Sequence, residues 1–305
     1  MKKTFYSNGK LLITGEYLVL DGAKAFALPT KFGQNLNIED GTNQEISWKS
    51  YNEDGTIWFD DTIAFSEITN PEITVTSTVK STLVAILHEA YLMQPSFLTD
   101  SKGHQITTEL SFPKKWGLGT SSTLINNIAQ WLQIDAFELL KNSFGGSGYD
   151  IACAQNNNPI TYQLQKGKPK VENVKFQPNF TDTIYFVYLN KKQDSKTAIA
   201  NYQKNKTDNF EKSIETINKL TTEVLYAKTV SSFAHALEKH EAEMSSILET
   251  TTVKENLFSD FNGQVKSLGA WGGDFVMVVS EVNPKTYFNS KGFNTILTYE
   301  EMILS

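Results

Sequence analysis

A glycine-containing turn ahead of an apolar run most constrains the fold of this chain. Residues 112–131 read FPKKWGLGTSSTLINNIAQW. Gly117 and Gly119 allow a tight turn, and the three hydroxyl residues 120–122 can cap a helix that begins there. The sequence therefore predicts a turn that leads directly into a helix, and this turn either is only structural or binds a ligand.

The start of such a helix is suited to an anion. Its first backbone amides have no partner within the helix and carry a partial positive charge, so glycines that let the backbone come close make a phosphate site. Lys114 and Lys115 can add positive charge. The chain has neither the G-x-x-x-x-G-K-[ST] pattern of P-loops nor G-x-G-x-x-G. Two further glycine-rich segments, residues 145–150 and 269–274, favour the ligand-binding interpretation.

Composition narrows the class of protein. The chain has 305 residues, 40% hydrophobic and 20% charged, with a formal net charge of -6, which is typical of a globular protein. The acidic balance gives no electrostatic signal for nucleic acid, and no segment reaches the roughly 18 apolar residues of a membrane span. One cysteine cannot form an internal disulfide, and the four histidines match no zinc-binding spacing. We expect a cytoplasmic monomer or homodimer that binds neither nucleic acid nor a membrane.

Hydrophobic periodicity outlines the secondary structure. Apolar spacing predicts a helix over residues 77–93, with Ser77 or Thr78 as its cap, and two more over 209–227 and 229–249. Strands are expected in eight segments: 10–20 (as a pair of strands), 25–39, 45–51, 56–60, 105–112, 159–165, 182–189 and 274–280. The lysine-, glycine- and proline-rich residues 165–178 predict a boundary between two domains, 1–172 and 173–305.

Three segments, in this order, resemble the signature motifs of the GHMP kinase superfamily, which includes galactokinases, homoserine kinases, mevalonate kinases and phosphomevalonate kinases. Residues 8–22, NGKLLITGEYLVLDG, resemble the first motif, which is usually P-G-K followed by G-E and an aliphatic run. Residues 113–123 resemble the second, P-x-x-x-G-L-G-S-S-A, and residues 266–274 the third, K-x-T-G-A-G-G-G. The chain departs from these patterns at four positions: Asn8, Thr120, Ser122 and Trp271. The last of them places a bulky indole where the family commonly has a small glycine.

The resemblance implies an α+β protein with the two-lobed GHMP kinase fold. In that fold an N-terminal lobe like domain 2 of ribosomal protein S5, with a left-handed β-α-β crossover, is followed by a ferredoxin-like C-terminal lobe. The resemblance also implies ATP and Mg2+ as cofactors, and transfer of the γ-phosphoryl group of ATP to a small acceptor.

The resemblance further assigns roles to residues. Asp150 matches the catalytic base of mevalonate-kinase-like members, and Lys10 matches the lysine that pairs with this base and stabilises developing charge. Magnesium is expected at Ser121 and Glu138. The expected ligands of the ATP phosphates are Lys115, Gly117, Leu118, Gly119, Thr120, Ser121 and Ser122. The expected contacts of the acceptor are Glu16, Tyr17, Ser147, Lys196, Gly269, Ala270 and Gly272. Structural alternatives stay open, with Ser121 and Asp150 as helix caps and Lys10 as an ordinary lysine of a strand.

The form of the first motif bears on the acceptor. Gly-Glu-Tyr-Leu-Val-Leu is similar to the isoprenoid branch of the superfamily, so the resemblance implies a mevalonate or phosphomevalonate kinase acting on a hydroxyl or a phosphate. Three alternatives remain: a mevalonate diphosphate decarboxylase, a sugar or homoserine kinase, and a non-catalytic binding protein of the same fold.

Overall fold

The structure is a computed structural model of the chain, and it describes residues 2–71, 78–193, 195–204 and 210–304. The chain forms two compact units. Unit 1 consists of Met1–Gly9, Phe32–Lys114 and Leu118–Gln155, and unit 2 of Lys10–Lys31, Lys115–Gly117 and Asn156–Ser305. Two long strands, β1 (Lys3–Thr14) and β2 (Ala25–Asp40), contribute residues to both units.

Unit 1 contains a mixed sheet with the strand order β4-β3-β5-β2, and β1 pairs with β2. The other strands of this sheet are β3 (Glu45–Tyr51), β4 (Ile57–Ala64) and β5 (His104–Leu110). β5 runs antiparallel to the second half of β2, whereas β3 runs parallel to β5. In β3 the buried residues Ile46, Trp48 and Ser50 alternate with half-exposed ones, as expected of a strand in a sheet that is covered on one face.

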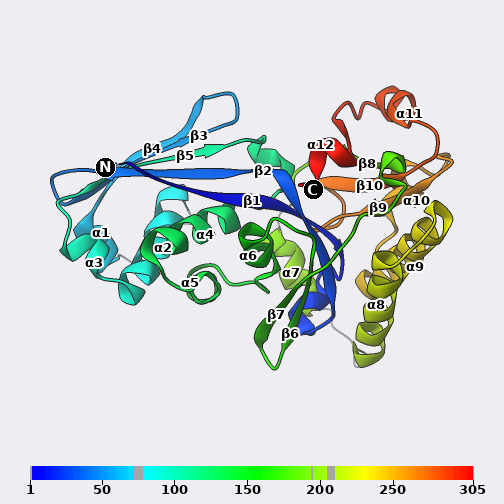
Figure 1. Ribbon diagram of the computed structural model, residues 1–305, viewed down its shortest axis with the longest axis horizontal. Coiled ribbons are helices and arrows are strands. Elements are labelled where there is room, and N and C mark those ends of the chain that lie inside the picture. Colours follow the sequence, from blue (N-terminus) through cyan, green and yellow to red (C-terminus); the bar gives the residue numbers. More distant parts are fainter. Residues whose placement is uncertain (1, 72–77, 194, 205–209, 305) are drawn as a thin grey trace. The chain divides into compact units, whose positions relative to one another are not determined.

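Helices cover one face of this sheet (Figure 1). They are α1 (Phe65–Thr69), α2 (Val79–Met93), α3 (Ser96–Thr99), α4 (Thr120–Leu132), α5 (Ala136–Ser143) and α6 (Tyr149–Gln155). The helix predicted over 77–93 is confirmed, and its cap is Thr78, whose side chain accepts a hydrogen bond from the amide of Ser81. Ser77, the other predicted cap, lies outside the described residues.

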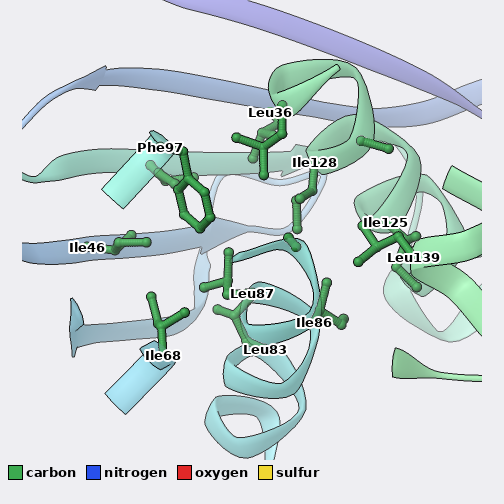
Figure 2. Packing of buried hydrophobic residues seen from close by; sticks show 14 of the residues in the cluster. Leu36, Ile46, Ile68, Leu83, Ile86, Leu87, Phe97, Ile125, Ile128 and Leu139 are labelled. Carbon is green, nitrogen blue, oxygen red and sulfur yellow. The ribbon is translucent and has the colours of Figure 1, made fainter. Parts of the chain in front are cut away.

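The core of unit 1 lies between these helices and the sheet. In Figure 2, side chains from α2 and α4 point into one cluster with side chains from the sheet. Leu87 of α2 and Ile125 and Ile128 of α4 are completely buried there. Burying one such aliphatic side chain contributes about 1.5–3 kcal/mol. The apolar face of α4 therefore fixes this helix on unit 1.

Unit 2 contains a hairpin and a separate four-stranded sheet. The hairpin strands are β6 (Ile160–Gln165) and β7 (Lys168–Asn173), and β6 pairs with the beginning of β2. The order in the second sheet is β11-β8-β10-β9, with every neighbouring pair antiparallel. Its strands are β8 (Ile184–Tyr188), β9 (Gln264–Ser267), β10 (Phe275–Val279) and β11 (Ile296–Thr298). All residues of β8 and β10 are buried, as in central strands.

Two long helices of unit 2, α8 (Phe210–Leu225) and α9 (Val230–Leu248), lie side by side (Figure 1). They confirm the helices predicted over 209–227 and 229–249. The shorter elements of the unit are η1 (Leu18–Asp21), η3 (Thr181–Thr183), α7 (Ser195–Lys204), α10 (Val253–Leu257), α11 (Lys285–Ser290) and α12 (Tyr299–Met302). In the part of the chain that the structure describes, no helix has the length and apolar character that crossing a bilayer requires.

Two differences from the predicted elements have physical causes. The pair of strands expected over residues 10–20 is wrong in its second half, because the chain turns at Tyr17, whose φ is 58°, and continues as η1. β7 was not predicted because it is an edge strand whose lysine-rich side chains are almost all exposed, so it lacks an apolar alternation. β7 pairs with β6, which in turn pairs with the beginning of β2, and the last segment of unit 2 begins at Asn156.

Candidate functional site

The turn before α4 has the backbone that its glycines predict. It begins with the 3-10 turn η2 (Lys114–Trp116). Gly117 and Gly119 then have φ values of 71° and 97°, in the left-handed region that glycine adopts without strain. Gly119 is the N-cap residue of α4, and no side chain accepts a hydrogen bond in the cap position. The first amides of α4 can thus donate to an external acceptor, which is the property required of an anion site.

Buried amide and hydroxyl side chains hold α4 in unit 1. Thr123 Oγ1 donates to Gln34 Oε1 at 2.7 Å, and Asn127 Nδ2 donates to the Gln34 carbonyl at 2.9 Å. Asn126 Nδ2 donates to Ser7 Oγ at 2.8 Å, and Ser7 Oγ donates to Asn127 Oδ1 at 2.7 Å. Because each of these buried polar groups has a partner, the amide-rich run after the turn is compatible with a packed helix. The run anchors α4 to β1 and β2.

Asp150 lies beside the beginning of α4. Ser122 Oγ, in the first turn of α4, donates to Asp150 Oδ2 at 2.9 Å, and Asp150 itself lies in the first turn of α6. Ser122 is buried, whereas Ser121 is exposed. The contact orients a carboxylate next to the uncapped amides. Two predicted functional residues are therefore brought together within unit 1.

The structure does not bring the two predicted magnesium ligands, Ser121 and Glu138, into contact in the part of the chain that it describes. Glu138 is exposed on α5, and no hydrogen bond links it to Ser121 in the described part of the chain. Within residues 2–71, 78–193, 195–204 and 210–304, no three His, Cys, Asp or Glu side chains are grouped so as to hold a metal. The hydroxyl of Ser121 and the carboxylate of Glu138 are oxygen donors of the kind that Mg2+ prefers, and Mg2+ commonly takes only one or two protein ligands with phosphates. Such donors fit a nucleotide-bound ion better than a metal cage made of protein alone.

In unit 2, Lys10 reaches the other end of the turn. Lys10 Nζ donates to the Gly117 carbonyl at 2.9 Å. Tyr188 Oη donates to the Lys115 carbonyl at 3.1 Å, and the Trp116 ring packs edge-on against Phe275 with centroids 5.4 Å apart. Residues 115–117 are thus fixed by β1, β8 and β10.

Glu16 of the first motif belongs to a buried ion cluster, which we define as Glu16, His240, Glu241 and Lys266. Glu16 is 1% exposed and Lys266 0%, and Lys266 Nζ forms an ion pair with Glu16 Oε1. Glu241 Oε2 lies 3.9 Å from Lys266 Nζ, and Glu241 accepts hydrogen bonds from the amide and hydroxyl of Ser267. Burial raises the pKa of Glu16 to about 7 although Lys266 opposes the rise, and burial also raises the pKa of Glu241.

The protonation of His240 follows from its partner. The Gly15 amide donates to His240 Nε2 at 3.1 Å, so this nitrogen carries a lone pair and the proton resides on Nδ1. Burial, with the charge of Lys266, keeps the pKa of His240 well below its usual range. Within the described residues, Glu16 Oε2 and His240 Nδ1 have no hydrogen-bond partner. The Gly15–Glu16 turn is therefore held from the inside of unit 2 by one neutral ring and one buried cation.

The third motif packs against the first. The amide of Trp271 donates to Tyr17 Oη at 3.2 Å. The indole of Trp271 is 8% exposed and shares an apolar cluster with Tyr17 and Tyr202, whose rings lie 5.4 Å apart. Gly269 and Gly272 have φ values of 66° and 86° on either side of it. The unusual Trp271 thus faces the interior of unit 2, and the glycines beside it supply the tight turn.

The remaining predicted residues have less definite settings. Ser147 is half-buried ahead of α6, and Ala270 is buried. Lys196 lies in α7, but its side chain is outside what the structure describes.

The sequence interpretation missed Glu241 and His240, although both lie on the buried stripe of α9 formed by Leu237, His240, Glu241 and Met244. A carboxylate at an apolar position of an amphipathic helix was the signal that could have found them.

Several solved structures are similar in fold to this chain. No protein-family model and no curated protein matches the sequence. The mevalonate kinase of Methanococcus jannaschii is similar in structure, with a TM-score of 0.71 at 15% identity over 100% of this chain and 99% of that protein. The Streptococcus pneumoniae phosphomevalonate kinase in complex with phosphomevalonate and AMPPNP has a TM-score of 0.71 at 15% identity, over 97% of this chain and 99% of its own. The Lactococcus lactis galactokinase complexed with galactose has a TM-score of 0.66 at 14% identity, over 95% and 88%. The chain therefore has the α+β fold of these kinase structures, which is the fold that the resemblance to GHMP kinases implied.

Proposed function

We propose that this protein is an ATP-dependent kinase that transfers the γ-phosphoryl group of ATP to a small acceptor of the mevalonate type. The observation that carries the proposal is the contact between Ser122, at the uncapped start of α4, and Asp150. An anion-binding helix start and an oriented carboxylate are two groups that phosphoryl transfer to an alcohol uses. The similarity in fold to phosphomevalonate and mevalonate kinases supports this reading.

The turn before α4 is proposed to bind the nucleotide. The backbone of Gly117, Leu118, Gly119, Thr120 and Ser122 would approach the phosphate oxygens, and the exposed Lys115 would add positive charge. Ser121 and Glu138 are proposed as magnesium ligands, with phosphate oxygens and water completing the coordination. When bound, the ion would neutralise charge on the phosphates.

The proposed transfer exchanges one bond for another. The acceptor oxygen bonds to the γ-phosphorus while the bond from that phosphorus to the β–γ bridging oxygen breaks, and ADP leaves. Where the acceptor is an alcohol, its proton passes to Asp150, whose carboxylate Ser122 orients. Lys10 is proposed to stabilise the charge that develops during the transfer.

The first and third motifs are proposed to form the acceptor side. Its proposed contacts are Tyr17, Ser147, Lys196, Gly269, Ala270 and Gly272. Glu16, whose carboxylate is buried with Lys266, would shape this side by holding the turn that presents Tyr17. A structural neighbour that binds phosphomevalonate and AMPPNP supports a phosphorylated or hydroxylated acceptor of this class.

An acceptor screen tests the proposal. ATP-dependent ADP release would be measured with mevalonate, phosphomevalonate, mevalonate diphosphate, homoserine and galactose, with and without Mg2+. We expect turnover with mevalonate or phosphomevalonate. Release of carbon dioxide from mevalonate diphosphate would identify a decarboxylase instead. A folded protein that neither binds ATP nor releases ADP with any acceptor would be a non-catalytic protein of this fold, and the kinase proposal would be refuted.

A further inference from the structure

Asp274, at the end of the third motif, has a conformation that needs an explanation. It follows Gly273 and precedes β10, and its φ is 53°, in the left-handed region that a non-glycine residue occupies at a cost of about 1–2 kcal/mol. Its amide donates to the Lys191 carbonyl at 2.6 Å, and its carbonyl accepts from the Leu189 amide at 2.8 Å. The backbone at Asp274 is therefore held on both sides by the segment that follows β8.

This backbone directs the carboxylate of Asp274 onto the turn before α4. A methyl group added to Gly117 would lie 2.5 Å from Asp274 Cγ and 2.8 Å from Oδ1, closer than atoms can approach. The carboxylate therefore occupies the space that a side chain at Gly117 would need. Asp274 Oδ1 also accepts a hydrogen bond from the Gln193 amide at 3.2 Å, which limits the rotation of the carboxylate. Two motifs that are 157 residues apart in the sequence thus meet within unit 2.

The same place holds a positive charge. Lys10 Nζ donates to the carbonyl of Gly117, the residue on which the carboxylate rests. Burial raises the pKa of Asp274, while Lys10 and then Lys192 favour its ionised form. In a partly buried setting, opposite charges interact more strongly than they would in water. The ammonium and the carboxylate both lie against Gly117.

We propose that Asp274 is a positioning residue that fixes Lys10 at the Gly117 carbonyl. The inference rests on the proposed kinase function, in which Lys10 stabilises charge during the transfer. A lysine has four rotatable side-chain bonds, so its ammonium must be held by its surroundings to stay where it is needed. The carboxylate at Gly117 attracts the ammonium toward this carbonyl, and the left-handed backbone of Asp274 is what aims the carboxylate there.

The substitution Asp274→Asn tests the proposal. Asparagine has the same shape, tolerates the left-handed region and can still accept from the Gln193 amide, so only the charge is lost. If Asp274 orients Lys10 for the transition state, kcat should fall at least about tenfold while the KM for ATP changes by less than about threefold. The measurements are ADP release with mevalonate and phosphomevalonate as acceptors and binding of a fluorescent ATP analogue. The control is Asp260→Asn, which removes an exposed carboxylate of unit 2 that contacts Lys291, and which should leave both constants unchanged.

A double-mutant cycle separates positioning from a purely structural role. In a Lys10→Met background, Asp274→Asn should change kcat by less than about twofold, because its target is already absent. If the two losses instead multiply, or if Asp274→Asn lowers the melting temperature and raises the KM for ATP as much as it lowers kcat, the carboxylate serves packing alone and the proposal is overturned. An Asp274→Asn enzyme as active as an active wild type overturns this inference only. A wild type without ATP binding or turnover overturns the kinase proposal and this inference together.

Discussion

Replacing Lys266 by methionine is expected to destabilise unit 2 strongly and in a pH-dependent manner. Lys266 is 0% exposed and lies between Glu16 and Glu241. Methionine has a similar length and keeps the packing, but it leaves two buried carboxylates without their cation. Removing one partner of a buried ion pair typically costs about 3–5 kcal/mol. We therefore expect the free energy of unfolding at pH 8 to fall by about that amount.

The pH dependence follows from Glu16. Its pKa rises from an ordinary 4.5 to about 7 in the folded protein, so the folded state binds the proton more tightly than the unfolded chain. The resulting stabilisation is complete below pH 4.5 and is lost as the pH rises through 7. Without Lys266 the carboxylate should take up its proton at still higher pH. The penalty of Lys266→Met should thus be smaller at pH 5 than at pH 8.

Urea denaturation at pH 5 and pH 8, followed by tryptophan fluorescence, measures these differences. Glu16→Gln in the Lys266→Met background should recover part of the loss at pH 8, because one stranded charge is removed. The control is Lys219→Met on α8, where an exposed lysine 3.9 Å from Glu223 should contribute less than about 0.5 kcal/mol. If Lys266→Met unfolds within about 1 kcal/mol of the wild type at pH 8, or if its penalty does not grow with pH, the assignment of a buried ion cluster is wrong.

Three further predictions concern the proposed site and the core. Asp150→Asn should abolish turnover while leaving ATP affinity largely intact in a fluorescent-nucleotide titration, because the amide can still accept from Ser122 but cannot take a proton; unchanged turnover would reject Asp150 as the base. Ser121→Ala should raise the Mg2+ concentration needed for half-maximal ADP release, with partial rescue by excess Mg2+. An effect on thermal stability alone would show that Ser121 has only a structural role. Leu87 is fully buried on α2, so Leu87→Ala should lower the free energy of unfolding by about 2–5 kcal/mol. The control is Leu92→Ala, which should change this free energy little because Leu92 is 59% exposed on the same helix. Similar losses at both positions would contradict the packing of α2.

Local features of the fold were predictable from the sequence because their causes are local. The apolar spacing of α2, α8 and α9 and the alternation in β3 report which face of each element is buried, and this face depends only on helical or strand geometry. The turn at Gly117 and Gly119 was equally predictable from the sequence, since glycine is the residue that takes a positive φ without strain. The lysine-rich β7 gave no such signal, because nothing covers its side chains.

In the candidate site too, some features follow from the local sequence and others depend on tertiary contacts. The sequence by itself determined the three glycine-rich turns, the hydroxyls at the start of α4 and the position of Asp150 at the beginning of a helix. Only the tertiary structure decided that Glu16 is buried against Lys266, that His240 supports Gly15, that Trp271 points inward and that Asp274 rests on Gly117. The charge state of a carboxylate, and so its role, depends on how much water it loses and which cation it meets. The burial of these side chains and their charged partners depend on segments more than 150 residues away along the chain. No local sequence pattern predicts which of these segments will come together.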